Sequence, residues 1–320
     1  MNTILHANGL RKSFTRKGKT VEAVRGADLA VAPGEIFGFL GPNGAGKTTT
    51  LRMLATLLQP DGGDAIIAGF DLRKDPFMVR SRIGYVSQAG GSDRDMTALE
   101  DLLLQGRLYG MTRGNAYDRA RHLLDALELS SIADRKSGTY SGGQKRRLDI
   151  ALGMMHAPAL LFLDEPTTGL DPQSRVHLWD EVRRLRDAGT TIFLTTHYMD
   201  EADLLSDRIA IMDKGRIVAE GTPAALKQQV AGDMVLLGLT EDGSVAERAL
   251  SLFREQTYVR EAGYENGKVR LYVRQGETIL PDLLRLLDRE RIGLQSVTLS
   301  QPTLDDVFLK QTGRSLGEES

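Results

Sequence analysis

The residues best suited to chemistry lie in a glycine-rich stretch near the start of the chain, which reads Gly41-Pro42-Asn43-Gly44-Ala45-Gly46-Lys47-Thr48-Thr49. An apolar run precedes it and a helical pattern follows. Glycines let successive backbone amides point at one anion, and a helix N-terminus adds partial positive charge. Lys47 would then reach the outer phosphates of a nucleotide, and the Thr48 hydroxyl would bind Mg²⁺. A glycine-rich turn without a ligand is the alternative, but the flanking strand and helix favour a phosphate loop.

Two carboxylates follow a buried strand further along the chain, in Leu160-Leu161-Phe162-Leu163-Asp164-Glu165. In open α/β sheets, ligands bind at the carboxyl ends of the strands. Asp164 therefore suits a role in holding Mg²⁺, and Glu165 could polarise an attacking water. Acidic residues at a strand end are common in any protein, so this pair gains its meaning from sharing a sheet with the phosphate loop.

A third motif reads Tyr140-Ser141-Gly142-Gly143-Gln144-Lys145-Arg146. Ser141 and Gln144 have the spacing of a capping box, which starts a helix without any ligand. The two glycines leave the backbone amides bare, so the same helix end could also hold a phosphate. Both interpretations fit the sequence.

Two polar residues follow other strands of the same predicted sheet. His197 comes after the β-rich run Thr190 to Thr196, and Gln88 ends the run Ile83 to Ser87. A single histidine is more often packed than catalytic, and a single glutamine is uninformative by itself. Both become candidate site residues because they would lie at the same sheet edge as Lys47 and Glu165.

The elements around these motifs alternate between strand and helix. Strands are predicted over Glu35 to Leu40 and Ala159 to Leu163, and helices over Lys47 to Leu58 and Pro172 to Ala188. Asp171 stands at the N-cap position of the last helix. This order predicts an α/β fold with a mostly parallel sheet and helices on both sides. Residues 89–156 have mainly helical spacing and predict a helical insertion.

The pattern changes after Gly221-Thr222-Pro223. The order β-α-β-β-α-β is predicted from Met234 to Leu299, with a hairpin turn at Glu265-Asn266-Gly267, and this is the ferredoxin-like arrangement. A short helix holding Leu304 to Leu309 would follow. We therefore expect one domain over residues 1–223, a small α+β accessory or dimerisation domain over 224–313, and a loose tail over 314–320.

Composition excludes several classes of function. The chain has 320 residues, a formal net charge of −2 and no cysteine, so thiolate metal sites and cysteine nucleophiles are impossible. No apolar run approaches the roughly 20 residues that a membrane-spanning helix needs, and the first residues do not have the pattern of a secretory signal. The charge balance gives no sign of nucleic-acid binding, and no nucleic-acid partner is expected.

Together and in this order, the motifs resemble the ATP-binding subunit of an ABC transporter, a P-loop NTPase fold, from about Ile4 to Pro223. The resemblance implies that Gln88 senses Mg²⁺ and communicates with a membrane partner, and that the loop ending at Asp171 crosses a dimer seam. It also implies that Phe14 stacks on adenine, a position where tyrosine is commoner, and that Tyr140 replaces the usual leucine.

The family's mechanism implies a head-to-tail pair of chains that sandwiches two ATP molecules. Ser141, Gly143 and Gln144 of one copy would cap the γ-phosphate that Lys47 of the other copy holds. Glu165 would then act as general base for ATP hydrolysis, and His197 would hold the γ-phosphate and water in line.

A finer resemblance is to the antibiotic-resistance branch, of the daunorubicin-exporter type (ABC-2 class). It rests on three segments: 146–151, 196–203 and the ending Pro302-Thr303-Leu304-Asp305-Asp306-Val307-Phe308-Leu309. It implies efflux of a drug-like or lipid-like substrate through a separate integral membrane permease, with this chain peripheral on the cytoplasmic face of the cell membrane.

Two other classes of protein also contain a phosphate loop. A soluble ABC ATPase of translation or nucleic-acid repair would usually carry two cassettes or a long coiled coil, and this sequence has neither. A P-loop kinase would not explain the Ser141 helix start. Nucleic-acid stimulation of ATP hydrolysis would favour the first of them.

Overall fold

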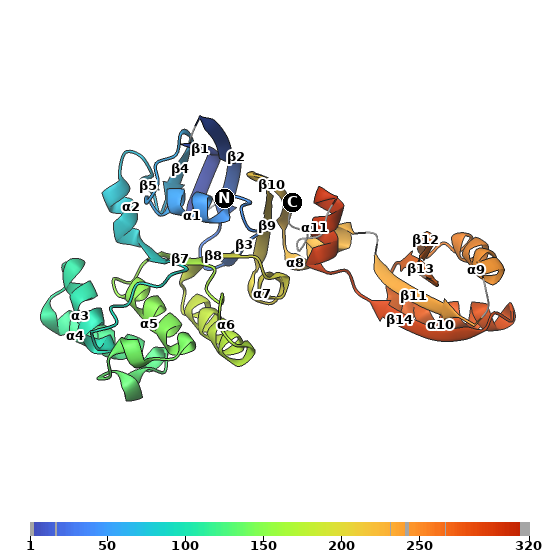
Figure 1. Cartoon of the computed structure of the whole chain (residues 1–320). Helices are drawn as coiled ribbons and strands as arrows, with labels where there is room; N and C mark the ends of the chain where they lie inside the picture. Colours follow the sequence, from blue (N-terminus) through green and yellow to red (C-terminus); the bar gives the residue numbers. More distant parts are fainter. Residues whose placement is uncertain (1–2, 17, 231, 241–242, 266, 314–320) are drawn as a thin grey trace. The chain divides into compact units, whose positions relative to one another are not determined.

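The computed structural model describes residues 3–313 apart from 17, 231, 241–242 and 266. The chain divides into two compact units, Met1–Thr222 and Pro223–Ser320, which Figure 1 draws with their elements labelled. In the described ranges, no helix combines the length and apolar character that crossing a membrane would require.

A six-stranded sheet forms the centre of the larger unit, in the order β10-β9-β3-β8-β7-β6. All neighbouring pairs are parallel except the hairpin of β9 and β10. The strands are β3 (Ile36–Leu40), β6 (Ile83–Val86), β7 (Leu160–Asp164), β8 (Thr191–Thr196), β9 (Arg208–Asp213) and β10 (Arg216–Gly221). The predicted mostly parallel sheet is therefore confirmed.

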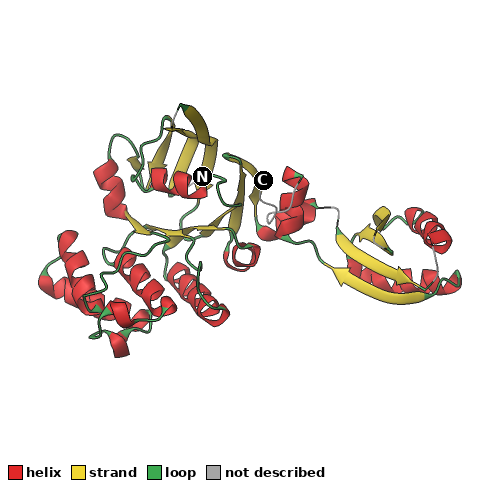
Figure 2. Cartoon of the chain, in the orientation of Figure 1, coloured by secondary structure: helices red, strands yellow, loops and turns green. Residues whose placement is uncertain are grey.

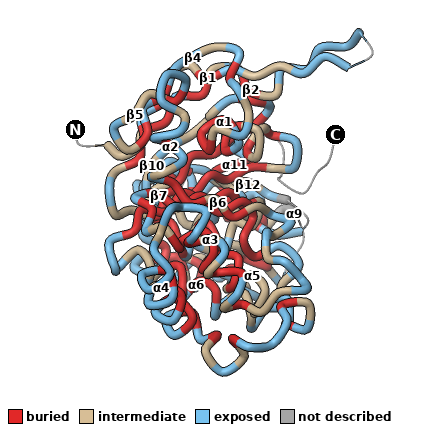
Figure 3. The backbone as a smooth tube through the Cα atoms, turned by 90° about the vertical axis from the view of Figure 1, so that its left-hand side faces the viewer, coloured by how far each residue is buried: buried red, intermediate tan, exposed pale blue. Residues whose placement is uncertain are grey.

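The central strands β3, β7 and β8 are buried at every position because both of their faces are covered. Along β7, Leu161 and Leu163 pack into one core, whereas Leu160 and Phe162 pack into the core on the opposite face. Figure 3 shows β6 and β7 as buried, in contrast to the exposed far end of the β1–β2 hairpin. Continuous apolar runs of this kind are typical of covered parallel strands.

A second, antiparallel sheet shares one of these cores with helix α1 (Lys47–Leu54). Its order is β2-β1-β4-β5, and sequence analysis did not predict it; the strands are β1 (Leu5–Arg16), β2 (Lys19–Val31), β4 (Gly62–Ile67) and β5 (Phe70–Asp71). Helix α2 (Pro76–Arg82) follows it in sequence. Helix α1 was predicted to reach Leu58, and this was wrong: Thr56 has a left-handed backbone, with φ of 62°, which ends the helix before it.

Helices cover the other face of the parallel sheet, as Figure 2 shows. The insertion holds α3 (Ala98–Leu108), α4 (Arg113–Ala126), two single 3₁₀ turns (Ser130–Ile132 and Ser137–Thr139) and α5 (Gly142–Met154). Helices α6 (Pro172–Asp187) and α7 (Met199–Leu205) complete this layer. The predicted helical insertion is confirmed, and α5 begins at Gly142, immediately after its N-cap Ser141.

The smaller unit contains the predicted ferredoxin-like fold. Its sheet has the order β12-β13-β11-β14, and all of its strand pairs are antiparallel. The elements are α8 (Pro223–Gln229), β11 (Asp233–Leu239), α9 (Gly243–Arg254), β12 (Val259–Glu265), β13 (Lys268–Val273), α10 (Gly276–Arg289), β14 (Leu294–Ser300) and α11 (Leu304–Thr312). Helices α9 and α10 contribute Phe253 and Leu283 to a core with Val235 and Leu271 of the sheet. Asn266 of the predicted hairpin turn and the predicted tail 314–320 lie outside the described residues.

Candidate nucleotide-binding site

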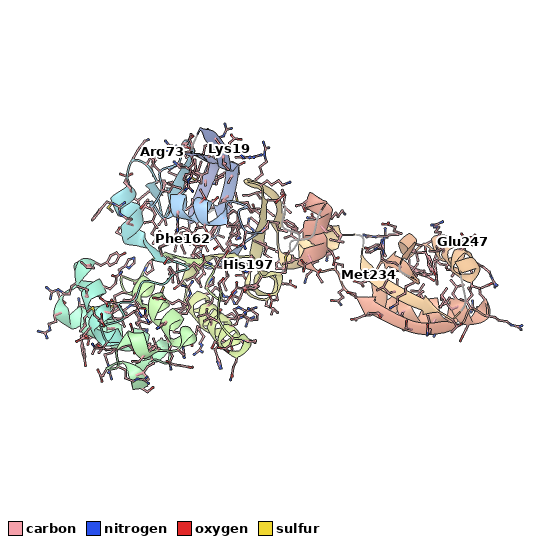
Figure 4. All side chains as sticks on the ribbon, in the orientation of Figure 1. Lys19, Arg73, Phe162, His197, Met234 and Glu247 are labelled. Carbon is pink, nitrogen blue, oxygen red and sulfur yellow. The ribbon has the colours of Figure 1, made fainter. Side chains whose placement is uncertain are left out.

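The predicted site residues meet at the carboxyl edge of the parallel sheet. The phosphate loop follows β3, Gln88 comes after β6, Glu165 follows β7 and His197 follows β8, where Figure 4 labels it. A cavity of about 530 Å³ lies at this edge; it is lined by Phe14, Ala23, Asn43, Gly44, Gly46, Lys47, Thr48, Thr49, Gln88 and Glu165. Parallel strands bring residues from four distant segments to one point, as expected for this class of sheet.

The phosphate loop is held in a fixed curve around the Lys47 side chain. Lys47 is only 4% exposed, and its Nζ donates hydrogen bonds to the carbonyls of Gly41 at 2.8 Å and Pro42 at 3.1 Å. Gly46 has φ of +109°, and a Cβ there would lie 2.4 Å from the carbonyl oxygen of Ala23. Only glycine fits this position, and this explains one of the spacings in the motif.

Burial lowers the pKa of Lys47 from its ordinary value, and the nearby Glu165 carboxylate opposes this effect. The Nζ of Lys47 lies 3.4 Å from Oε1 of Glu165, which is itself 8% exposed. A buried ammonium needs a negative partner. In the structure that partner is the side chain proposed as general base.

Glu165 is surrounded by polar groups from its own loop and from two further segments. The Nε2 of Gln88 donates to its Oε2 at 3.1 Å, and the hydroxyl of Thr168 donates to the same oxygen at 3.2 Å. Nδ1 of His197 lies 3.2 Å from Oε2, although the angles are not those of a hydrogen bond. The Glu165 backbone has φ of 45°, unusual for a residue with a side chain. This strained position directly after β7 is the kind of feature that clusters at functional sites.

Two oxygen ligands suited to Mg²⁺, one from Thr48 and one from Asp164, lie beside the phosphate loop. The hydroxyl of Thr48 donates to Oδ1 of Asp164 at 3.1 Å, and the hydroxyl of Thr195 donates to the same oxygen at 2.8 Å. Mg²⁺ is usually held by one or two carboxylates together with waters and substrate phosphates. Thr48 and Asp164 fit this requirement. The described residues contain no group of three or more His, Cys, Asp or Glu that could hold a metal by themselves. Waters and phosphate oxygens would complete the shell.

Phe14 lies on β1 at the rim of the cavity. It is exposed, and the Nζ of Lys12 lies 5.8 Å from the centre of its ring. Thr49 and Phe14 line the same cavity. An exposed aromatic ring beside a phosphate loop offers a flat face to a base, which suits the stacking predicted for Phe14.

The Ser141 element does not line this cavity. Its capping box is formed: Ser141 N–H donates to Oε1 of Gln144 at 2.9 Å, and Gln144 N–H donates to Ser141 Oγ at 3.3 Å. Gly142 and Gly169 line a different cavity, while Asp171 caps α6 by accepting the N–H of Ser174 at 2.9 Å. The ligand-free interpretation of Ser141 is thus satisfied locally, and within one copy neither Ser141, Gly143, Gln144 nor Asp171 lines the cavity that Lys47 lines.

Sequence analysis missed a residue that joins these segments. Arg146 is buried, and its guanidinium donates to the carbonyls of Pro166 at 2.8 Å, Ser87 at 2.6 Å and Asp164 at 3.0 Å. It therefore fixes the backbone beside both Gln88 and Glu165. One signal was available: Arg146 is an arginine on the predicted helix that starts at the Ser141 motif.

Thr195 was also missed. Its hydroxyl donates to Asp164 and accepts the backbone N–H of Glu165 at 3.0 Å. Thr195 lies in the β-rich run before His197, and sequence analysis predicted no role for its side chain. The pairing of Thr195 with Asp164 across β8 and β7 cannot be read from a single sequence.

The parallel sheet, the phosphate loop and the acidic strand end define a P-loop ATPase. Residues 24–168 match the ABC transporter family, and residues 221–312 match the C-terminal domain of ATP-binding proteins of the DrrA1-3 type. The chain is 46% identical to the daunorubicin/doxorubicin resistance ATP-binding protein DrrA of Streptomyces peucetius, over 93% of this chain and 90% of that protein. The chain belongs to the ABC transporter ATP-binding proteins, and the translation and repair alternative is not supported.

Two further proteins of known type are similar to this chain. It is 37% identical to the linearmycin resistance ATP-binding protein LnrL of Bacillus subtilis (strain 168), over 98% of this chain and 99% of that protein. A solved dimeric structure of the ATP-binding cassette MJ0796 bound to ADP and Pi is similar with a TM-score of 0.62 and 25% identity, and covers 68% of this chain and 98% of that one.

Proposed function

We propose that this chain is the ATP-hydrolysing subunit of an exporter and acts as a head-to-tail dimer that sandwiches ATP. In this proposal it drives efflux of a drug-like or lipid-like compound through a separate membrane permease. The chain would lie peripherally on the cytoplasmic face of the membrane. The export direction and the substrate class rest on the names of relatives that confer resistance to daunorubicin and linearmycin.

The observation that carries the proposal is the division of the site within one chain. Lys47, Thr48 and Glu165 line one cavity, while the residues around Gly142 and Gly169 line another. The bare amides at the start of α5 are suited to a phosphate. A second copy, turned head to tail, would supply these amides to the phosphate held by Lys47, and the dimeric cassette with ADP and Pi supports such a pairing.

Hydrolysis would use the residues around Lys47 in distinct roles. Phe14 would stack on adenine, and the loop amides with Lys47 would hold the phosphates. Glu165 would accept a proton from the attacking water as the bond to the γ-phosphorus forms and the ADP oxygen leaves. His197 and Gln88 both lie beside Oε2 of Glu165, where they would orient the water and the γ-phosphate.

Mg²⁺ bound with ATP would neutralise charge on the β- and γ-phosphates. Thr48, Asp164 and Gln88 would hold it. The hydroxyl of Thr195 would keep the Asp164 carboxylate turned toward Thr48, because it hydrogen-bonds the same Oδ1 atom.

A groove beside Gln88 is suited to the permease. A cavity of about 330 Å³ is lined by Leu57, Arg80, Tyr85, Ser87, Gly90, Tyr109 and His156, among others. Apolar side chains of this part of the unit are left open to solvent: Leu57, Phe77 and Leu108, the last of them 73% exposed. Exposed apolar surface of this kind marks binding sites for other proteins. Because Ser87 and Gly90 flank Gln88, a permease bound here would act directly on the segment that contacts Glu165.

Co-purification and transport together test this proposal. The chain should be retained in membranes only when its permease is present, and candidate drugs should stimulate ATP hydrolysis by the reconstituted pair. Leu108→Asp should release the chain from the membrane while ATP binding stays intact. Stimulation of ATP hydrolysis by nucleic acid, with no membrane retention, would overturn the exporter assignment.

A further inference from the structure

One edge of the C-terminal sheet carries no charge. Strand β14 lies at the end of the order β12-β13-β11-β14 and pairs only with β11 in the described part of the chain. Its sequence, Leu294-Gln295-Ser296-Val297-Thr298-Leu299-Ser300, contains no charged residue, proline or glycine. Residues 295–298 are exposed in succession. An open strand edge of this length can pair with another strand, and proteins usually block such edges with charges, proline or bulges.

The opposite edge of the same sheet is blocked in the usual way. Strand β12 carries Arg260, Glu261 and Glu265 within seven residues. It also has a register shift between Val259 and Glu261 where it pairs with β13. Strand β14 also has a register shift, between Leu294 and Ser296 where it pairs with β11. The two edges therefore differ in charge: β12 carries charged residues and β14 carries none.

The register of β14 with β11 determines on which face of the sheet each β14 side chain lies. Val297 and Leu299 lie opposite Leu237 and Val235, which belong to the core under helices α9 and α10. Ser296 and Thr298 lie opposite Gly238 and Leu236 and point to the other face. Val297 is nevertheless 38% exposed, because none of the described strands continues the sheet beyond β14.

We propose that β14 pairs antiparallel with β14 of a second copy of this chain, which joins two C-terminal sheets into one of eight strands. A two-fold axis at Val297 would place Val297 against the second Val297, and Ser296 against Thr298. These would be an apolar contact and a hydroxyl–hydroxyl hydrogen bond, both of the kind that stabilises cross-strand pairs. An uncharged strand brings two identical copies together without like-charge repulsion, and this favours a second copy over a charged partner strand.

This contact would not depend on nucleotide. It would hold two copies near one another before ATP arrives and raise their effective concentration for formation of the ATP sandwich. It rests on the C-terminal sheet alone, so it can fail while the ATP-sandwich proposal stands, and the reverse is also true.

The absence of cysteine from the chain makes the contact directly testable. Ser296→Cys, Val297→Cys and Thr298→Cys would each be prepared in full-length protein that also carries Lys47→Ala, so that nucleotide cannot pair the chains. Tyr264→Cys on β12, also exposed, is the matched control. Side chains opposite each other in antiparallel strands are close enough for a disulfide, so at least one β14 variant should form cross-linked dimer about tenfold faster than the control.

Sedimentation equilibrium without nucleotide gives a second readout that needs no cysteine. Val297→Lys would place two ammonium groups opposite each other and should raise the dimer dissociation constant about tenfold or more. Val297→Thr keeps an uncharged β-branched residue and should leave a dimer. The proposal is overturned if all three β14 cysteines cross-link no faster than Tyr264→Cys, if Val297→Lys leaves the dissociation constant unchanged, or if membrane-bound Val297→Cys joins a different polypeptide instead of a second copy.

Discussion

Lys47 and Glu165 form a buried ion pair, with 3.4 Å between Nζ and Oε1. The residue predicted to hold the γ-phosphate is thus neutralised by the residue predicted to activate water. A γ-phosphate that enters the cavity would take over Lys47 as its counter-ion and free the Glu165 carboxylate. Binding of ATP and exposure of the general base are then one event.

This relationship predicts two effects of Glu165→Gln. Turnover should fall by about a hundredfold or more because the base is lost. ATP should bind more tightly because Lys47 no longer has an anionic competitor, and an ATP-bound dimer should accumulate. Phosphate release and light scattering with ATP measure the two effects. Glu247→Gln, on the exposed surface of α9, is the control, and turnover at the wild-type rate in Glu165→Gln would refute the assignment.

Lys47→Ala should lose ATP binding. The substitution removes the cation and leaves the Glu165 carboxylate, which would repel the γ-phosphate. Calorimetry should give an affinity at least about tenfold lower, equal to about 1.4 kcal/mol. Thermal unfolding of the apo-protein checks that the fold survives, and an unchanged affinity in a folded variant would contradict the phosphate-loop assignment.

Arg146→Lys should damage both stability and turnover. A lysine cannot reach the three carbonyls of Pro166, Ser87 and Asp164 at once. Loss of such hydrogen bonds should lower the free energy of unfolding by about 2–4 kcal/mol. Urea denaturation measures this, and turnover should fall because the segments holding Gln88 and Glu165 lose their common anchor.

Arg147→Lys is the matched control for that substitution. Its guanidinium contacts the carbonyl of Leu127 and the exposed carboxylate of Glu128. Exposed ion pairs contribute little, so this variant should stay near wild type. Equal effects of the two substitutions would show that Arg146 has no special role.

Stability should depend on pH through Glu201. Burial raises the pKa of this carboxyl, although the neighbouring side chains of Thr196, Thr167 and Trp179 oppose the shift. The Nε1 of Trp179 donates to Oε1 at 3.1 Å. Because the folded-state pKa lies above the unfolded one, the stability contributed by the bound proton is present below the unfolded pKa and is lost as pH rises through the folded pKa.

Glu201→Gln should therefore flatten the decline in the free energy of unfolding as pH rises above the ordinary carboxyl pKa. Urea denaturation at a series of pH values measures the slope, with Glu247→Gln as the control. A slope in Glu201→Gln as steep as in the wild type would place the titrating group elsewhere.

Most of the larger unit could be predicted from the sequence because its signals are local. The phosphate loop needs glycine where Gly46 approaches Ala23, and the capping box needs Ser141 and Gln144 at fixed spacing. The ferredoxin-like order of the smaller unit followed in the same way from alternating patterns and turns.

What could not be predicted depends on contacts between distant segments. The antiparallel sheet of β1, β2, β4 and β5 was missed because its long strands alternate irregularly, with several register shifts between β1 and β2. The end of α1 at Leu54 depends on the left-handed backbone of Thr56. The roles of Arg146 and Thr195 arise only when β6, β7 and β8 lie side by side.

The central claim is that two copies of the chain together form each ATP-binding site. Mixing two inactive variants tests this claim most directly. Lys47→Ala lacks the phosphate-binding lysine, and Ser141→Arg blocks the start of α5; each should be inactive alone. In a mixed dimer, one site would join an intact Lys47 to an intact Ser141, so an equal mixture should recover about a quarter of wild-type ATP hydrolysis. No recovery in the mixture, together with full activity of the wild type at dilutions where it is monomeric, would contradict the account.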